Sequence, residues 1–194
     1  MPRIHRLVAH ALPLLLLAAC SSLPLSRPAA SQAPVASIRS DYVGKYYLND
    51  GPLKGVTPEM IASIPEPTPK KETLSKGAKR PYDILGNRYV PMTEMAPYRV
   101  QGIGTWYGTR YHNQKGAIGE VYDMLKLTAA HPTLPLPSYA RVTNLENGKS
   151  IVVRVNDRGP FLHDRLIDLS YAAAERLGYA QKGSARVEVE LLFP

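Results

Sequence analysis

The chain has 194 residues, a formal net charge of +8 and a single cysteine. The length suits one domain of ordinary size with additional segments, and one cysteine excludes an internal disulfide. No cysteine pair or HExxH pattern suggests a metal site, so we expect neither a metal nor a cofactor. A positive charge favours polyanionic partners, but the sequence carries no nucleic-acid-binding motif, and we expect no nucleic acid among its partners.

Residues 1–19 have the layout of a lipoprotein signal peptide. A basic start at Arg3 and Arg6 precedes an apolar run that is shorter than the about 20 residues of a membrane-spanning helix. Leu17–Cys20 resembles a lipobox, in which the cysteine is acylated, and Ser21 in place of Asp resembles an outer-membrane signal. We expect an anchor through Cys20 at the periplasmic face of the outer membrane, where peptidoglycan is the available polyanion. The alternative is an ordinary signal peptide with a chance cysteine.

Residues 20–80 are rich in residues that break regular structure and poor in apolar periodicity. Eleven of the 18 prolines lie between residues 21 and 97, three of them in the run from Pro65 to Pro69. Such a stretch buries too little apolar surface to offset its ordering entropy, so we expect a Pro-rich, largely disordered tether. Residues 81–97 differ, because two short strands around Gly86-Asn87 are predicted, and we expect a small β extension there.

Residues 98–194 are predicted to form a mainly β domain with one short helix. Asn147-Gly148 between two β-rich runs predicts a hairpin, and the last strand alternates apolar and acidic residues. Ser170 and Gly178 suit the two ends of a helix. Many short strands with one helix favour a small closed barrel. The expected strands are Ile103–Tyr107, Leu125–Ala130, Tyr139–Leu145, Ser150–Asn156 and Val187–Leu191.

Four side chains of this domain are candidates for chemistry on a glycan, which needs an acid for the leaving oxygen and a group that stabilises the cationic sugar. Asp157 ends an apolar strand beside a tight turn, and an Asx turn paired with Arg158 is the alternative. Asp168 is a site candidate or a partner of the following helix N-terminus. Glu120 lies in a glycine-containing loop, where a solvated charge is the alternative. His131 follows a strand, and a structural histidine is the alternative.

Aromatic side chains add a second indication of a glycan. Trp106 and Tyr107, with Tyr111 and His112, could line a sugar groove, because sugars stack on flat apolar faces. The alternative for Trp106 is a place in the barrel core.

Several segments together resemble the rare lipoprotein A family, and the similarity extends almost continuously over residues 98–190. The resemblance implies a six-stranded double-psi β-barrel. It also implies an endolytic peptidoglycan transglycosylase that prefers glycan strands without stem peptides. The segments are Gly104–Gly108, Gly119–Met124, Leu127–His131, Leu134–Tyr139, Val155–Phe161 and Ile167–Ala174.

The resemblance also assigns site residues. Asp157 and Glu120 correspond to the acids tied to activity, with His131 nearby, and Asp168 resembles a groove aspartate of expansins and related barrels. We expect these four to act in catalysis, and we expect the following four to bind substrate: Trp106, Tyr107, Tyr122 and Arg158. Asp157 would protonate the glycosidic oxygen, and the 6-hydroxyl of N-acetylmuramic acid would attack its own anomeric carbon.

Two alternative functions remain, and the sequence differs from many family members in two places. The domain could be a non-catalytic, expansin-like binding module, or a scaffold that recruits other wall proteins. Gly116–Glu120 lacks a polar residue that many members carry before the glutamate. The chain stops at Pro194 without the SPOR domain of many members, so we expect any septal targeting to come from another source.

Overall fold

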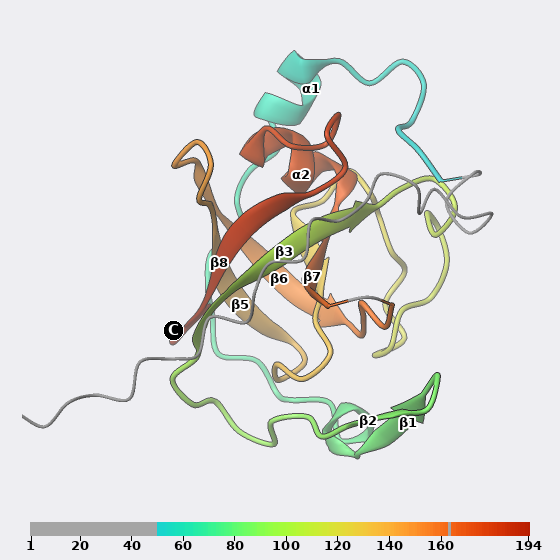
Figure 1. Ribbon diagram of the computed structural model, residues 1–194, viewed down its shortest axis with the longest axis vertical. Helices are drawn as coiled ribbons and strands as arrows, with labels where there is room; N and C mark the ends of the chain where they lie inside the picture. The colour runs from blue at the N-terminus through green and yellow to red at the C-terminus, as the bar shows by residue number, and fades with distance from the viewer. Residues whose placement is uncertain (1–49, 163) are drawn as a thin grey trace, which may run out of the picture. The chain divides into compact units, whose positions relative to one another are not determined.

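The computed structural model describes residues 50–162 and 164–194 (Figure 1). The expected signal peptide, the lipidation site at Cys20 and the tether as far as residue 49 lie outside the described residues. Within the described part of the chain, no helix is long and apolar enough to cross a membrane.

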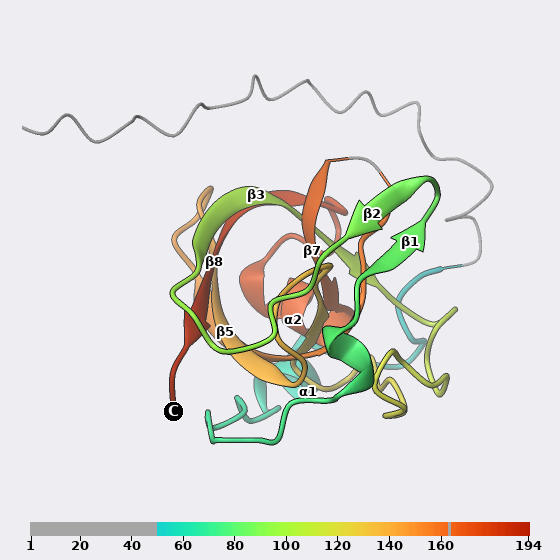
Figure 2. The same ribbon diagram turned by 90° about the horizontal axis from the view of Figure 1, so that it is seen from below.

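Six strands close into a barrel, as expected from the sequence. Their order around the barrel is β3-β7-β4-β6-β5-β8, with β3–β7 and β4–β6 parallel and the other neighbours antiparallel. Figure 2 shows β3, β8 and β5 curving around one side of the barrel. Closure leaves no open sheet edge. The strands are β3 (Arg99–Tyr107), β4 (Thr128–Ala130), β5 (Ser138–Asn144), β6 (Ser150–Asp157), β7 (Arg165–Ser170) and β8 (Ala185–Leu192).

Alternation along the strands forms the core. Ile151, Val153 and Val155 of β6 are buried, whereas the residues between them are half-buried. The same alternation in β8 buries Val187, Val189 and Leu191 and leaves Glu188 and Glu190 between them half-buried. Two details differ from the sequence prediction: β4 is shorter than expected, and β7 was not predicted.

The expected helix is α2 (Tyr171–Leu177), which begins and ends as its sequence predicts. The hydroxyl of Ser170 accepts a hydrogen bond from Ala173 N (3.3 Å), and Gly178 adopts a left-handed conformation with φ of 77°. Only glycine takes this conformation without strain, so it ends the helix. Two further short elements precede the barrel: α1 (Pro58–Ala62) and a 3-10 turn, η1 (Gly77–Lys79).

Residues 50–80 differ from the expected tether, because they pack against the barrel. Asp50 accepts hydrogen bonds from Gly108 N (3.0 and 3.1 Å), and Glu66 accepts one from Val152 N (2.8 Å). Ser75 N donates to a carbonyl of the barrel, 2.8 Å away. Apolar packing adds to these polar contacts, because Ile61 is buried and belongs to the core cluster. Isolated residues make the contacts, so they leave no apolar periodicity in the sequence. We call residues 50–80 the strap.

The β extension after the strap is a hairpin, as expected. Its strands are β1 (Tyr82–Ile84) and β2 (Asn87–Tyr89), and they pair antiparallel. The turn falls on Leu85 and Gly86, which both have positive φ, so it begins one residue earlier than the predicted Gly86-Asn87 turn. The Tyr82 hydroxyl donates to Pro132 O (2.7 Å) and so connects the hairpin to the barrel.

Candidate active site

Asp157 is the last residue of β6 and contacts the turn formed by residues 116–120. Its Oδ1 accepts hydrogen bonds from Ala117 N (2.7 Å) and Arg158 N (2.8 Å). Gly116 lies so close that a Cβ there would be 2.9 Å from the Asp157 carboxyl carbon. Burial raises the pKa of Asp157 above its usual 3.8, although both N–H donors and the charge of Arg158 lower it. Asp157 is therefore more readily protonated than an ordinary aspartate.

Glu120 ends the same turn, and its surroundings favour the ionised carboxylate, in contrast to those of Asp157. Gly116 N donates to Glu120 O (2.8 Å), which closes the turn. The Glu120 carboxylate accepts hydrogen bonds from Arg154 Nη1 (2.6 Å) and Nη2 (2.9 Å), and from Asn156 Nδ2 (2.9 Å). These bonds, those from Arg154 above all, lower the pKa of Glu120 below 4.5. Glu120 is therefore an anion.

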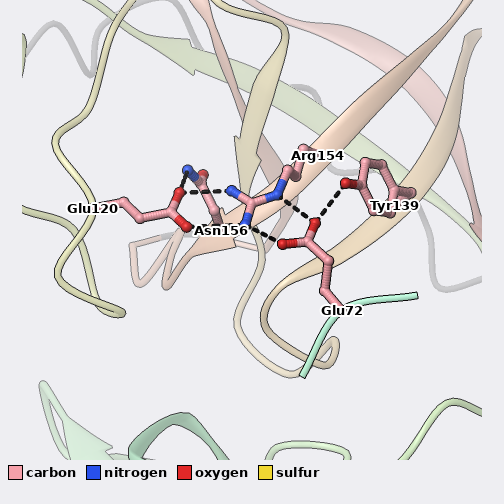
Figure 3. A network of polar contacts seen from close by, with 5 residues as sticks. All are labelled: Glu72, Glu120, Tyr139, Arg154 and Asn156. Carbon is pink, nitrogen blue, oxygen red and sulfur yellow. Dashed lines mark hydrogen bonds and ion pairs between the residues drawn. The ribbon is translucent and has the colours of Figure 1, made fainter. Parts of the chain in front are cut away.

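Arg154 also binds a second carboxylate, which comes from the strap (Figure 3). Glu72 accepts hydrogen bonds from Arg154 Nε and Nη2, both at 2.8 Å, and from the Tyr139 hydroxyl at 2.5 Å. The bonds from Arg154 hold the pKa of Glu72 at about 2. Sequence reasoning missed Glu72, because nothing in the Pro-rich run around it indicates a barrel contact.

Asp168 of β7 lies two strands away from Asp157, at the same level of the barrel. Ala130 of β4 is in register with Asp157 on one side and with Asp168 on the other. Asp168 is half-buried, binds the Thr105 hydroxyl, and forms an ion pair with Arg165 (2.8 Å). Burial raises its pKa, and Arg165 opposes that shift. The structure thus brings Asp168 near the pair but gives it an internal partner for its charge.

His131 contacts Asp157 through the backbone only, with His131 N donating to Asp157 O (3.0 Å). Its Nδ1 accepts hydrogen bonds from Thr133 N (3.1 Å) and Leu134 N (3.0 Å), so the ring proton lies on Nε2, which faces the Tyr98 hydroxyl at 3.0 Å. Burial lowers the pKa of His131 from 6.5 to about 3. The ring is neutral, both of its nitrogens are hydrogen-bonded, and it stabilises the turn that follows β4. The structure therefore favours the structural alternative over the expected catalytic role.

The four expected substrate-binding side chains have partners inside the protein. Trp106 Nε1 donates to Ala180 O (2.9 Å), and its ring packs on Tyr171 with centroids 5.2 Å apart. Tyr107 and Tyr122 are buried and stack on each other with centroids 4.0 Å apart. The structure therefore favours core packing for these three rings.

Arg158 connects the strap to the barrel. Its Nη1 donates to His131 O (3.0 Å) and Leu134 O (2.7 Å), and its Nη2 donates to Ala78 O (2.8 Å). The guanidinium is thus held by three carbonyls, and its Nε is buried without a hydrogen-bond partner among the described residues. This placement favours a structural role over the expected binding role, which stays a prediction. Among the described residues, no group of three His, Cys, Asp or Glu side chains is arranged to hold a metal ion.

The arrangement thus supplies two carboxyl groups at one turn, with Glu120 at its end and Asp157 of β6 hydrogen-bonded to it, and their pKa values are shifted in opposite directions. Such a pair is the usual signature of an acid and an anionic partner in one site. Residues 99–189 match a family model described as "Lytic transglycolase". Fold and family match together define the barrel as a lytic transglycolase domain with the double-psi topology.

Similar proteins with curated names indicate more closely which family the chain resembles. The chain is 49% identical over 179 residues to the "Endolytic peptidoglycan transglycosylase RlpA" of Pseudomonas aeruginosa, an alignment that covers 92% of this chain and 50% of the relative. It is 51% identical over 125 residues to the protein of the same name from Neisseria meningitidis, with 64% of this chain and 52% of the relative covered. The chain belongs to the RlpA family, and it spans about half the length of these relatives.

A solved structure of the Streptomyces papain inhibitor is also similar. It has 24% identity and a TM-score of 0.42, and the match covers 50% of this chain and 96% of that chain.

Proposed function

We propose that this protein is a lytic transglycosylase that cleaves the β-1,4 bond between N-acetylmuramic acid and N-acetylglucosamine in peptidoglycan strands. The observation that carries the proposal is the pair of carboxyl groups at the turn of residues 116–120. Asp157 contacts the turn from β6 and has a raised pKa, and Glu120 ends the turn and is an anion. The family match and the names of the relatives support the same substrate class. The preferred substrate is a strand without stem peptides, and the cellular role is wall remodelling during daughter-cell separation.

The proposed reaction assigns the acid role to Asp157. Both hydrogen bonds that Asp157 accepts from described residues go to Oδ1. We therefore assign the proton that is transferred to Oδ2. That proton passes to the glycosidic oxygen as the bond from this oxygen to the anomeric carbon of muramic acid breaks. The sugar then carries positive charge, which the carboxylate of Glu120 stabilises.

The nucleophile is the muramic acid's own 6-hydroxyl. Its oxygen bonds to the anomeric carbon and forms a 1,6-anhydro ring, and its proton goes to a carboxylate. Asp157, which has just lost a proton and has the raised pKa, is a better acceptor than Glu120, whose pKa is lowered. Asp157 returns to its starting state, no water is consumed, and the intramolecular attack gains from proximity.

The test is digestion of glycan strands stripped of stem peptides, followed by mass spectrometry of the products. We expect 1,6-anhydromuramic ends from the wild type and a release about a thousandfold slower from Asp157→Asn. Reducing ends would indicate a hydrolase and reject the lyase reaction. Binding to strands without any soluble product would favour the non-catalytic binding module.

We also propose that the protein is a lipoprotein of the outer membrane, anchored through Cys20. The support is the sequence of Leu17–Cys20 and Ser21, which resembles an acylation signal. Labelled palmitate should enter the wild type and not Cys20→Ser, and the label should fractionate with the outer membrane. Equal labelling of both proteins would reject the anchor.

A further inference from the structure

We propose that Glu72 of the strap is a positioning residue of the active site, which shares Arg154 with Glu120 and so leaves Glu120 with a net negative charge. This inference rests on the proposed function and deepens it. The family model begins at residue 99, so Glu72 lies outside the part of the chain on which that match depends.

The geometry of Arg154 carries the inference. The guanidinium uses Nε and Nη2 for Glu72, and Nη1 and Nη2 for Glu120, at 2.6–2.9 Å (Figure 3). Bidentate pairs of this kind fix the plane of the guanidinium. Glu72 therefore sets the orientation in which Arg154 meets Glu120, although Glu72 and Arg154 are 82 residues apart in the chain.

Arg154, Glu72 and Glu120 form a cluster whose net charge determines how well it stabilises a cationic sugar. Arg154 supplies one positive charge, and Glu72 and Glu120 supply two negative charges, so the cluster keeps one negative charge. Without Glu72, the arginine would neutralise Glu120, and the pair would stabilise a cationic sugar less well. The Arg154 and Glu72 side chains are each 20% exposed, so water screens this balance only in part.

Of the remaining groups around Arg154, Glu72 and Glu120, two are neutral, and Lys70 is a cation that forms no hydrogen bond with the cluster among the described residues. Tyr139 donates its hydroxyl proton to Glu72, and Asn156 donates an amide proton to Glu120, so both stay neutral. Lys70 acts on Glu72 through its charge alone and lowers its pKa. Because the pKa of Glu72 is about 2, Glu72 remains ionised at any pH at which the protein would work.

The chain offers a matched control in Glu66, which lies on the same strap. Glu66 accepts hydrogen bonds from Val152 N (2.8 Å) and from Arg176 Nη2 (3.3 Å), so it also ties the strap to the barrel. Glu66→Gln loosens that attachment without removing a charge beside Glu120. Glu72→Gln removes the charge and keeps the size of the side chain.

The experiment compares the two variants with the wild type on two readouts. The first is the rate of release of anhydro products from stripped glycan strands. For Glu72→Gln we expect kcat to fall about tenfold with KM little changed, because the lost charge acts on the transition state. We expect Glu66→Gln to keep the wild-type kcat. Glu72→Asp, which retains the charge, should recover part of the loss and also serves if Glu72→Gln folds poorly.

The second readout is the pKa of Glu120, measured by NMR titration of carbon-13-labelled glutamate without any substrate. In Glu72→Gln the pKa of Glu120 should fall by about half a pH unit. The reason is that the repulsion from the Glu72 charge disappears and Arg154 pairs with Glu120 alone. An unchanged Glu120 pKa, or equal losses of kcat in the Glu66 and Glu72 variants, would overturn the inference. A wild type without lytic activity would reject the proposed function, and the titration would still decide whether Glu72 tunes Glu120.

Discussion

Asp157 and Glu120 contact the same turn of the chain and are driven toward opposite protonation states. Ala117 N and the close approach of Gly116 enclose the carboxyl group of Asp157, and burial raises its pKa. Glu120, at the end of the turn, is paired with Arg154, and its pKa is lowered. The sequence left the acid and base roles of these two residues open. Their environments favour Asp157 as the acid and Glu120 as the anion.

Asp157→Asn should lower kcat/KM on stripped glycan strands by about a thousandfold, within the range attributed to a general acid. The amide N–H is not acidic enough to protonate the glycosidic oxygen. Binding should persist, because the substitution preserves the size of the side chain. The measurement is the initial rate of product release alongside a sedimentation assay with purified sacculi. Full activity in the variant would remove Asp157 from the acid role.

The rate should depend on pH in a bell shape whose limbs belong to two different residues. Asp157 must be protonated, so activity falls as the pH rises through its raised pKa. Glu120 must be ionised, so activity falls as the pH drops through its lowered pKa. Glu120→Gln should lower kcat by about a hundredfold and abolish the low-pH limb while keeping the high-pH limb. If Glu120→Gln instead abolished the high-pH limb, Glu120 would be the acid and Asp157 the anion.

His131 should make the folded protein less stable as the medium becomes acidic. The folded state holds the pKa at about 3, whereas the unfolded chain has the ordinary value of 6.5. Below 6.5 the unfolded state therefore binds a proton that the folded state does not, and stability falls by up to about 1.4 kcal/mol per pH unit until the folded pKa is reached. Urea unfolding at pH 7, 6 and 5 measures this slope.

His131→Gln serves as the comparison for that slope. The variant has a lower stability at every pH, but it lacks the titrating ring, so its stability should change less between pH 7 and 5. Glu72 does not interfere, because its stabilisation is lost only as the pH falls from 4.5 towards 2. Parallel slopes for wild type and variant would contradict the buried neutral histidine.

Arg158→Met should destabilise the fold by about 2–4 kcal/mol, because it leaves three backbone carbonyls without their donor. The matched control is Arg88→Met, since the Arg88 side chain is 64% exposed and pairs only with an exposed Asp83. A surface pair of this kind contributes about 0–1 kcal/mol. Chemical unfolding followed by circular dichroism measures both variants, and equal losses would argue against the structural role of Arg158.

Several elements of the fold followed from local patterns in the sequence. The helix α2 was predicted from Ser170 and Gly178, and the β5–β6 hairpin from Asn147-Gly148, because caps and tight turns depend on a few neighbouring residues. The strand β7 was missed, since Asp168 interrupts its apolar residues, and its position depends on β3 and β4 on either side.

The candidate site was predictable only in part. The motifs that contain Asp157 and Glu120 identified the pair, but the aromatic residues and Arg158 were assigned to the substrate because a sequence does not show which partners a side chain has already found. Trp106 is a clear example, as its indole N–H binds a carbonyl 74 residues further along the chain.

The sequence by itself determined the barrel strands that alternate clearly and the helix α2, because each depends on a short stretch of chain. The two carboxyl groups of the candidate site were assigned by the resemblance to family motifs, and their roles stay a prediction. Only the tertiary structure shows that burial raises the pKa of Asp157 while Arg154 lowers that of Glu120, that His131 is neutral, and that the strap contributes Glu72. Burial and ion pairing set these properties, and both depend on segments that lie far apart in sequence and meet when the barrel closes.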